Sequence, residues 1–452
     1  MACALVTLIT TPASAATSGS RLWVHRDNGG GAAVGSAIVS SPDGADVFVA
    51  GEITSSDGQD FLTEADSAST GRQLWVRRYA GPSGGNDAAN AIAVSPNGSA
   101  VFVTGLSAGA NGALDVLTIA YAADTGDRLW SQRYRAPGTN GSQAVALSVS
   151  PDGSELFATG SVTRRGRYPD YLTIAYDVPT GSVRWLRRYQ GTGHGDDDAT
   201  AIVAGPGGRT VFVTGESQGP VNFDFATVAY GTSGGHTRWV RRYDDPGHAY
   251  DDATAIGVDP HGSTVFVTGN GGAATARAGI ETIGYRTADG ATVWRSRYHG
   301  PFGAEGRALA VSPDGHQVFI AGIEGPSQTK PCVGDESGCW NATTLAYDAT
   351  SGSRMWVRRF DDGSDDVLSA LAVAPDGSKV FATGTSYPSS YLTLAFESAT
   401  GTRSWSAMYP RVGGTLGIAS AIAADPDGSR VFVTGQSTLT GPEDATTVAY
   451  VP

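Results

Sequence analysis

The sequence predicts an all-β protein, an eight-bladed β-propeller built of four-stranded antiparallel blades. Three observations in its 452 residues predict this fold: a Pro-Gly turn element recurs eight times, an apolar strand ending in Gly follows each turn, and a Trp-bearing strand recurs about every 50 to 60 residues. A unit of that length holds four short strands, and such units repeated along one chain are typical of propellers.

The first two strands of each unit flank the Pro-Gly turn, and an apolar third strand follows after a variable stretch. The turn elements, such as SPDG, begin at Ser41, Ser95, Ser150, Gly205, Asp259, Ser312, Ala374 and Asp425. The third strand reads LTIAY at Leu117 and Leu172, ATVAY at Ala226 and LTLAF at Leu392. Short apolar-alternating runs bounded by Gly, Asp and Pro indicate strands rather than helices.

The fourth strand carries Trp and follows a turn of the Thr-Gly type. In AYDVPTGSVRW, residues 175 to 185, Gly181 supplies the positive φ that a tight turn needs. The same spacing of Ala, Gly and Trp recurs along the chain and resembles the tryptophan-docking motif of the quinoprotein-like (PQQ-like) propeller repeat family of the secreted bacterial type. The resemblance covers essentially the whole mature chain and implies that eight Trp residues lock neighbouring blades together: Trp23, Trp75, Trp130, Trp185, Trp239, Trp294, Trp356 and Trp405. The Arg residues that follow many of them, as in WVRRY, are expected to lie in solvent on the outermost strand.

The two ends of the repeat array predict how the ring closes. The mature chain begins with a Trp strand, RLWVHR, and finishes on a third strand, ATTVAYVP. The eighth unit therefore lacks its own fourth strand, and the first unit has a spare one. Pairing the two closes the ring, so that no open sheet edge remains between the first and last blades.

Residues 1–15 are predicted to be a signal peptide, and residues 16–452 a single propeller domain. A short apolar run, residues 2–12, precedes Ala13-Ser14-Ala15, which is a small-residue cleavage pattern. The alternative for this segment is a buried N-terminal strand. No window of eighteen uninterrupted apolar residues follows it, so no transmembrane segment is expected. We expect a secreted, extracellular protein, or one of the periplasm or cell envelope.

Charge and cysteine usage limit the partners. The formal net charge is −13, which makes nucleic-acid binding unexpected. Cys332 and Cys339 are the cysteines that follow the signal segment, and in an exported protein so close a pair indicates a disulfide that closes a surface loop. A metal site would need further ligands of the same kind, and no His lies nearby.

Acidic connections lead into several of the innermost strands and are the candidate ligand or metal sites. They read HGDDDAT (194–200), DDPGHAYDDAT (244–254) and DDGSDDV (361–367). Their carboxylates are hard oxygen ligands that could bind calcium: Asp196, Asp197, Asp198, Asp251, Asp252, Asp365 and Asp366. No calcium-loop pattern is present, and solvated acidic turns are the alternative interpretation.

Catalysis finds little support in the sequence. A quinoprotein dehydrogenase would imply pyrroloquinoline quinone (PQQ) with calcium on the axis, but such enzymes typically use adjacent cysteines, which this chain lacks. No GxSxG or HExxH motif is present. We therefore predict no cofactor, with calcium the one candidate ion and PQQ not expected.

The function that we infer from the sequence is a secreted, monomeric, noncatalytic binding or scaffold module that recognises a protein or an extracellular glycan. The variable connections on one face of the propeller would contact the ligand, because variable loops on a rigid scaffold usually carry binding. One alternative is an extracellular metal-assisted enzyme, such as a hydrolase, a lyase or a degenerate quinoprotein dehydrogenase. Another is an assembly scaffold of the cell envelope, similar to the propeller of the outer-membrane assembly machinery.

Overall fold

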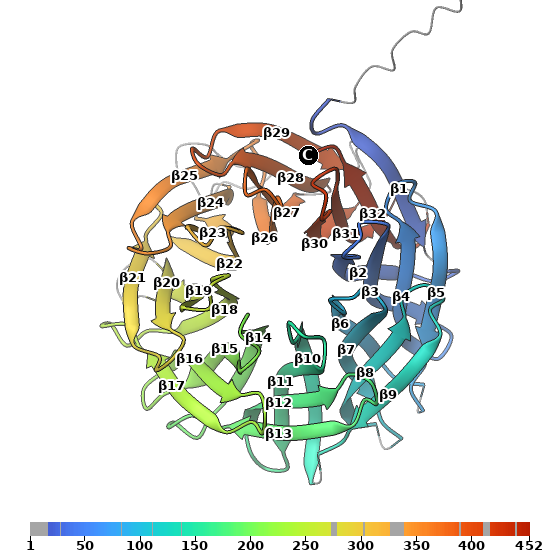
Figure 1. Cartoon of the computed structure of the whole chain (residues 1–452), viewed down its shortest axis with the longest axis horizontal. Helices are drawn as coiled ribbons and strands as arrows, with labels where there is room; N and C mark the ends of the chain where they lie inside the picture. The colour runs from blue at the N-terminus through green and yellow to red at the C-terminus, as the bar shows by residue number, and fades with distance from the viewer. Residues whose placement is uncertain are drawn as a thin grey trace, which may run out of the picture.

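The computed structural model describes residues 17–27, 29–82, 84–110, 112–136, 138–272, 278–301, 303–325, 339–387, 390–409, 416–438 and 441–452. These residues form 32 β-strands arranged in blades around a central axis (Figure 1). Within them, no helix is long and apolar enough to cross a membrane. The prediction of an eight-bladed, all-β propeller is confirmed.

Each blade contains four antiparallel strands, numbered here in chain order. Blade 1 contains β2 (Ala33–Ser40), β3 (Asp46–Ser55), β4 (Gly58–Ser67) and β5 (Gln73–Tyr79); blade 2 contains β6 (Asp87–Val94), β7 (Ala100–Ala108), β8 (Leu114–Ala122) and β9 (Arg128–Tyr134). Blade 3 contains β10 (Thr139–Val149), β11 (Glu155–Arg164), β12 (Pro169–Asp177) and β13 (Val183–Tyr189); blade 4 contains β14 (Asp197–Ala204), β15 (Thr210–Gln218), β16 (Phe223–Gly231) and β17 (Thr237–Tyr243). Blade 5 contains β18 (Asp251–Val258), β19 (Thr264–Gly271), β20 (Gly279–Arg286) and β21 (Thr292–Tyr298); blade 6 contains β22 (Ala304–Val311), β23 (Gln317–Glu324), β24 (Asn341–Asp348) and β25 (Arg354–Phe360). Blade 7 contains β26 (Asp366–Val373), β27 (Lys379–Ser386), β28 (Ser390–Glu397) and β29 (Arg403–Tyr409); blade 8 contains β30 (Gly417–Ala424), β31 (Val431–Ser437), β32 (Asp444–Tyr450) and β1 (Arg21–Asp27).

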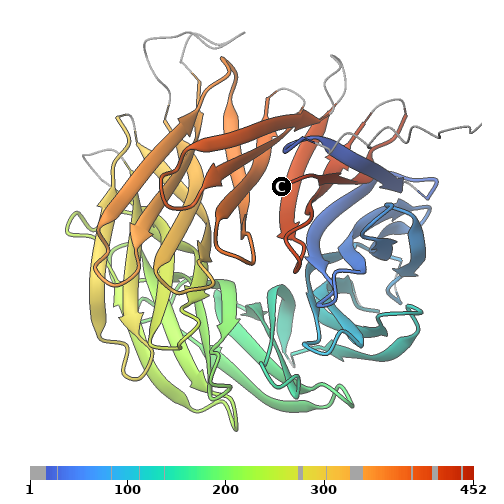
Figure 2. The ribbon, with the colours of Figure 1, turned by 45° about the horizontal axis from the view of Figure 1, so that its top comes forward.

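The first strand of each blade lies nearest the centre, and the Trp-bearing strand lies outermost (Figure 1). The Pro-Gly turns and the Thr-Gly turns therefore share one face of the ring, which we call the turn face. The second-to-third and blade-to-blade connections lie on the opposite face, which we call the loop face. Figure 2 shows the outermost strands of the blades at the periphery of the ring.

The ring closes through the strand that the sequence leaves spare. β1 pairs antiparallel with β32, with Val24 opposite Val448, and completes blade 8. The Thr-Gly turn of this blade is assembled from both ends of the described chain: Gly19 N–H donates to Val451 O at 2.8 Å, and Val451 N–H donates to Ser20 O at 2.9 Å. The corresponding turn of blade 1 contains the same two bonds within one continuous segment. The predicted closure is thus present.

The hydrophobic core lies between blades, and we call each blade-to-blade contact a joint. At the joint of blades 1 and 2, the Trp75 ring lies between Phe48 and Tyr121, with ring centroids 6.0 and 6.1 Å away. Its Nε1–H donates to Ala123 O of blade 2 at 2.8 Å. Gly126 lies against the same ring at φ 70°, where a Cβ would come within 2.6 Å of Trp75, so a side chain is excluded twice over.

The Arg residues after the Trp residues are not simply solvated, which corrects the sequence-based expectation. Arg77 donates from Nε to Gly126 O and from Nη2 to Thr125 O, both at 2.8 Å, and so binds the Thr-Gly turn of the next blade. Arg187, Arg241 and Arg358 bind the next turn in the same way. A guanidinium presents several donors in a fixed plane, which suits two adjacent carbonyls. These residues therefore belong to the joints.

Candidate functional site

Three of the predicted acidic residues are fully buried at the first position of an innermost strand. In blade 4, the Asp197 carboxylate accepts a hydrogen bond from Gly191 N–H at 2.7 Å and one from the Ser217 hydroxyl. In blade 5, Asp251 accepts from Asp245 N–H at 2.7 Å and from Gly272 N–H at 2.9 Å. These carboxylates attach the incoming connection to the inner strands.

In blade 7, Asp365 and Asp366 also accept hydrogen bonds from backbone N–H groups of the connections. The Asp366 carboxylate accepts from Asp362 N–H at 3.1 Å, and Asp365 Oδ1 accepts from Trp340 N–H at 2.9 Å. Burial raises the pKa of Asp366 to about 7 and that of Asp251 to about 6. The three buried carboxylates occupy three different blades, so the structure does not bring them together as ligands of one ion. Calcium binding stays a prediction.

The remaining predicted residues of blades 4 and 5 do lie close to one another. Asp198 stands opposite Glu216 in blade 4, and the hydroxyl of Tyr250 donates to the Glu216 carboxylate. In blade 5, the Asn270 amide donates to Asp252 Oδ2 at 3.1 Å. Burial raises the pKa of Asp252 to about 7, and the charges of Glu216 and Glu305 add to this rise. We call Asp198, Glu216, Asp252 and Glu305 the acidic rim.

The acidic rim occupies one side of the ring. Its members Asp198, Asp252 and Glu305 are half-buried at the second position of the innermost strands β14, β18 and β22. The same position holds an apolar side chain in blades 7, 8, 1 and 2: Val367, Ile418, Val34 and Ala88. Burial also raises the pKa of Asp198, to which Asp196 contributes a like charge. The loop-face end of the ring axis is therefore acidic on one side and apolar on the other.

Exposed apolar and aromatic side chains gather on the loop face of neighbouring blades. Val221 is 73% exposed between β15 and β16, Tyr168 is 60% exposed between β11 and β12, and Tyr250 is 47% exposed just before β18. A pocket of about 280 Å³ lies between blades 2 and 3 and is lined by Leu114, Gly141, Ser142, Gln143, Ser161 and Thr163. Exposed aromatic groups beside charge are typical of binding surfaces.

The predicted disulfide falls partly outside the described residues. Cys332 lies in the segment 326–338, which the structure does not describe, while Cys339 is 4% exposed beside Trp340. The pairing of Cys332 with Cys339 stays a prediction.

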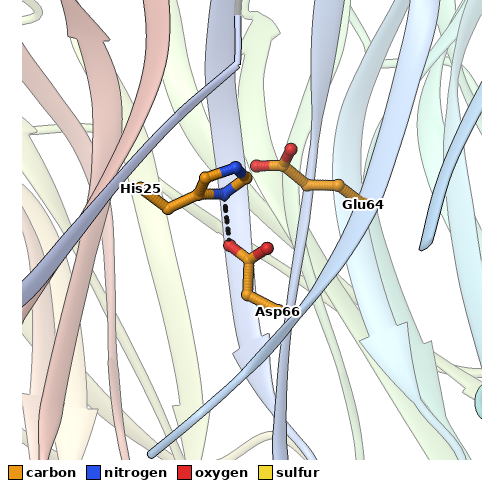
Figure 3. Close-up of side chains that lie close together, drawn as sticks. All are labelled: His25, Glu64 and Asp66. Carbon is orange, nitrogen blue, oxygen red and sulfur yellow. Dashed lines mark hydrogen bonds and ion pairs between the residues drawn. The ribbon is translucent and has the colours of Figure 1, made fainter. Parts of the chain in front are cut away.

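The structure also brings together a group that the sequence analysis missed. His25 of β1, in blade 8, approaches Glu64 and Asp66 of β4, in blade 1 (Figure 3). Nδ1 of His25 lies 2.7 Å from Asp66 Oδ2, and one candidate ligand atom from each of the three residues lies within 4.8 Å of the others. Glu64 and Asp66 are 1% and 0% exposed.

Electrostatics in this group favour positive charge. Burial lowers the pKa of His25, but the hydrogen bond and the charge of Asp66 outweigh it and raise the pKa to about 9. Burial and the neighbouring Asp66 charge raise the pKa of Glu64, and burial raises that of Asp66 despite its contact with His25. A sequence signal was present, because blade 1 reads LTEAD where blades 2 and 3 read LTIAY and the other blades also have an aliphatic and an aromatic residue at the two altered positions.

A family model described as "Outer membrane protein assembly factor BamB", of the PQQ-like repeat type, matches residues 12–265 and 281–442. The chain belongs to this family. No curated protein sequence matches this chain significantly.

Solved structures similar to this BamB-type propeller share its fold at low identity. Sqt1 of Chaetomium thermophilum, bound to the N-terminus of the ribosomal protein L10, has a TM-score of 0.62 at 13% identity over 94% of this chain and 98% of its own. The quinohemoprotein alcohol dehydrogenase of Comamonas testosteroni has a TM-score of 0.62 at 13% identity over 96% of this chain and 76% of its own. The C-terminal WD40 domain of Sif2 has a TM-score of 0.60 at 10% identity over 96% and 99%. These likenesses show the propeller fold.

The residues around the loop-face end of the axis do not fit PQQ. That quinone carries carboxylates, which need cationic or N–H donors, whereas Asp198, Glu216 and Asp252 would place like charges there. We derive no chemical step through a quinone.

Proposed function

We propose that this protein is a noncatalytic binding module of the cell envelope that holds a positively charged segment of a protein partner on its loop face. The observation that carries this proposal is the acidic rim, in which Asp198, Glu216 and Asp252 lie half-buried beside the exposed ring of Tyr250. Carboxylates whose ionised form is disfavoured by burial gain most from a cationic partner.

The surrounding surface supports an extended partner segment. Val221 and Tyr168 are exposed on the neighbouring connections, and the pocket between blades 2 and 3 could receive one apolar side chain of the partner. Propellers of this architecture accept protein segments, as the Sqt1 complex with the N-terminus of L10 shows for that protein. The predicted signal segment and the outer-membrane description of the family support an envelope location.

A glycan is the second candidate ligand. Tyr168, Tyr250 and Tyr387 are exposed on the loop face, and flat rings of this kind stack on the apolar faces of sugars. A glycan would not require the negative charges of the rim, so the two candidates differ in their dependence on Asp198, Glu216 and Asp252.

The first experiment places a photo-crosslinking amino acid at Val221 or Tyr250 in the producing cell. Control positions are Leu129 and Met355, which are 55% and 46% exposed on outer strands near the turn face. We expect one protein band from both loop-face positions and none from the control positions. Equal crosslinking from both faces, or none from the loop face, would overturn the proposal.

A second experiment separates the two ligand classes with purified protein. The variant Asp198→Asn with Glu216→Gln and Asp252→Asn removes rim charge, and Asp124→Asn with Asp127→Asn and Asp376→Asn removes the same charge from exposed turn-face positions. An arginine-rich peptide should bind the rim variant at least ~10-fold more weakly than wild type, and the control variant about equally. Unchanged peptide binding in the rim variant contradicts a charged protein partner, and oligosaccharide binding that survives in it supports the glycan.

A further inference from the structure

The joint between blades 8 and 1 breaks the repeat at four positions at once. The third strands of blades 2 to 8 have Ile, Val or Leu where blade 1 has Glu64, and Tyr or Phe where it has Asp66. The outer strands of blades 1 to 7 have Tyr or Phe where β1 has Asp27, and four of them have Arg where β1 has His25. Unrelated substitutions would be spread over several blades, whereas these four altered residues lie side by side across one joint.

The packing of this joint changes with them. At the other seven joints the docking Trp faces a Tyr or Phe ring of the next blade, as Trp75 faces Tyr121. Trp23 has Phe432 of its own blade as its ring partner, and Asp66 occupies the place of the missing ring. The apolar contact divides into two small clusters, one around Ile53 and Leu62 and another around Val47 and Phe432.

The carboxylates at this joint are incompletely satisfied. Oδ1 of Asp66 is buried and has no hydrogen-bond donor within the part of the chain that the structure describes. Within the described residues, the hydrogen bond that Glu64 accepts is a long one, 3.4 Å, from the Gln73 amide. Buried carboxylates are costly unless they are paired or bind a metal, and the contact of Asp66 Oδ2 with His25 leaves Oδ1 without a donor among the described residues.

We propose that His25, Glu64 and Asp66 bind a divalent first-row transition-metal ion, with Zn²⁺ as the type, which clamps β1 of blade 8 to β4 of blade 1. The three candidate ligand atoms lie within 4.8 Å of one another, so small side-chain movements bring them to about 2.0–2.2 Å from a common centre. Oδ1 of Asp66, which has no donor among the described residues, could supply a fourth ligand atom, and the 17% exposure of the His25 side chain gives water access to this side of the group.

The donor set selects the class of metal. An imidazole nitrogen with two carboxylates suits Zn²⁺ or Mn²⁺, whereas Ca²⁺ takes six to eight oxygen ligands and Mg²⁺ keeps several waters. Gln73 bridges Glu64 and Asp27, with its Nε2 at 3.2 Å from Asp27 Oδ2, and is thus an outer-shell residue that orients the Glu64 carboxylate.

A second acidic group in the molecule provides the matched control. Asp244, Asp245 and Asp251 also lie within 4.8 Å of one another. Asp245 is already bound by Arg297 Nη1 at 3.2 Å and by the N–H groups of Gly247 and Ala249, so a cation is present there in the form of a guanidinium. We therefore expect no metal at that group.

The binding test uses the full chain, freed of any affinity tag and stripped with chelator, and titrates it with Zn²⁺ in a calorimeter. We expect one tight equivalent, and Co²⁺ in its place should give visible d–d absorption. Glu64→Gln should weaken Zn²⁺ binding by more than ~10-fold, because even the loss of an outer-shell partner costs ~10–100-fold. Asp244→Asn should leave the binding unchanged. Absence of stoichiometric Zn²⁺ binding, or equal binding by Glu64→Gln, overturns the proposal.

A second variant, which lacks all three ligands but should fold, separates loss of metal binding from loss of the fold. His25→Arg with Glu64→Ile and Asp66→Tyr gives the three ligand positions the residues of the joint between blades 1 and 2, and should fold. Chelator should lower the melting temperature of the wild type, and Zn²⁺ should restore it, since a ligand that binds the folded state alone stabilises it by mass action. The variant should melt at the same temperature in both conditions. A melting temperature of the wild type that ignores Zn²⁺ and chelator counts against the clamp.

Discussion

Two joints of the same ring solve the same packing problem in different ways. Between blades 1 and 2, Trp75 lies against Tyr121 and Ile119 fills the space beside it. Between blades 8 and 1, Asp66 stands at the position of the partner ring of Trp23, and Glu64 replaces the aliphatic residue. Both Trp residues nevertheless donate Nε1–H to the next Thr-Gly turn, at 2.8 and 2.9 Å.

This backbone contact is present at seven joints, because Trp405 Nε1 alone has no acceptor among the described residues, while the side-chain layer beneath it varies more widely. Trp, a turn carbonyl and the turn glycine fix how two blades meet, because they depend on main-chain geometry. Seven joints fill the layer with rings and aliphatic side chains, which contribute most of the stability. The eighth gives up part of that stability to place three ionisable groups together.

The largest expected effect comes from moving the acids to an ordinary joint. Ile119→Glu with Tyr121→Asp should lower the free energy of unfolding by about 5 kcal/mol or more, because two buried carboxylates replace apolar groups while Arg77, which stands at the position of His25, is already bound to the Thr-Gly turn of blade 2. Urea denaturation followed by Trp fluorescence measures the loss. A loss below ~1 kcal/mol would mean that any joint tolerates these acids, and the contrast between the two joints would disappear.

A smaller effect separates the two Trp residues. Trp75→Ala should cost about 3–5 kcal/mol, since the ring is 6% exposed and packs against rings of both blades. Trp23→Ala, measured in chelator, should cost about 1–2 kcal/mol less, because the ring is half-buried and lacks the partner ring in blade 1. Equal losses would show that the backbone contact, and not ring packing, carries the stability of the joints.

The repeat was readable in the sequence because its turns and strands are local patterns. SPDG predicts a turn since the Ser41 hydroxyl bonds Asp43 and accepts from Asp46 N–H, all within six residues. The Arg77 contact with the next turn was not readable, because a solvated Arg and a docked one look alike in sequence. The acidic candidates could not be sorted from the sequence for a similar reason. Asp197 is buried and Asp198 is half-buried, and two adjacent Asp residues do not reveal this difference in burial. The group of His25, Glu64 and Asp66 could have been found as breaks in the repeat.

A third prediction concerns pH and a buried acid that has cationic neighbours. Glu281 of β20 is fully buried, with Arg295 Nε at 3.4 Å and Arg297 Nε at 3.7 Å, yet burial outweighs both and raises its pKa to about 7. A raised pKa means that Glu281 favours the folded state fully below its ordinary pKa of 4.5, and that this contribution is lost as the pH rises through 7. Between pH 4.5 and 7, the stability of the wild type relative to Glu281→Gln should therefore fall by about 1–3 kcal/mol, as urea titrations at several pH values would show. A relative stability that rises with pH would mean that the two arginines dominate.

The smallest effect tests the Arg contact that the joint of blades 8 and 1 lacks. Arg77→Met keeps much of the apolar stem but loses the bonds to Gly126 O and Thr125 O, and should cost about 1–2 kcal/mol, since the guanidinium is partly exposed. Arg128→Met, at an exposed position of the neighbouring outer strand, should change stability by less than ~0.5 kcal/mol. If the two variants lose the same amount, the turn contact contributes nothing measurable. A larger loss for Arg77→Met would show that this contact stabilises the four joints that contain it, whereas the joint of blades 8 and 1 has His25 at the same position.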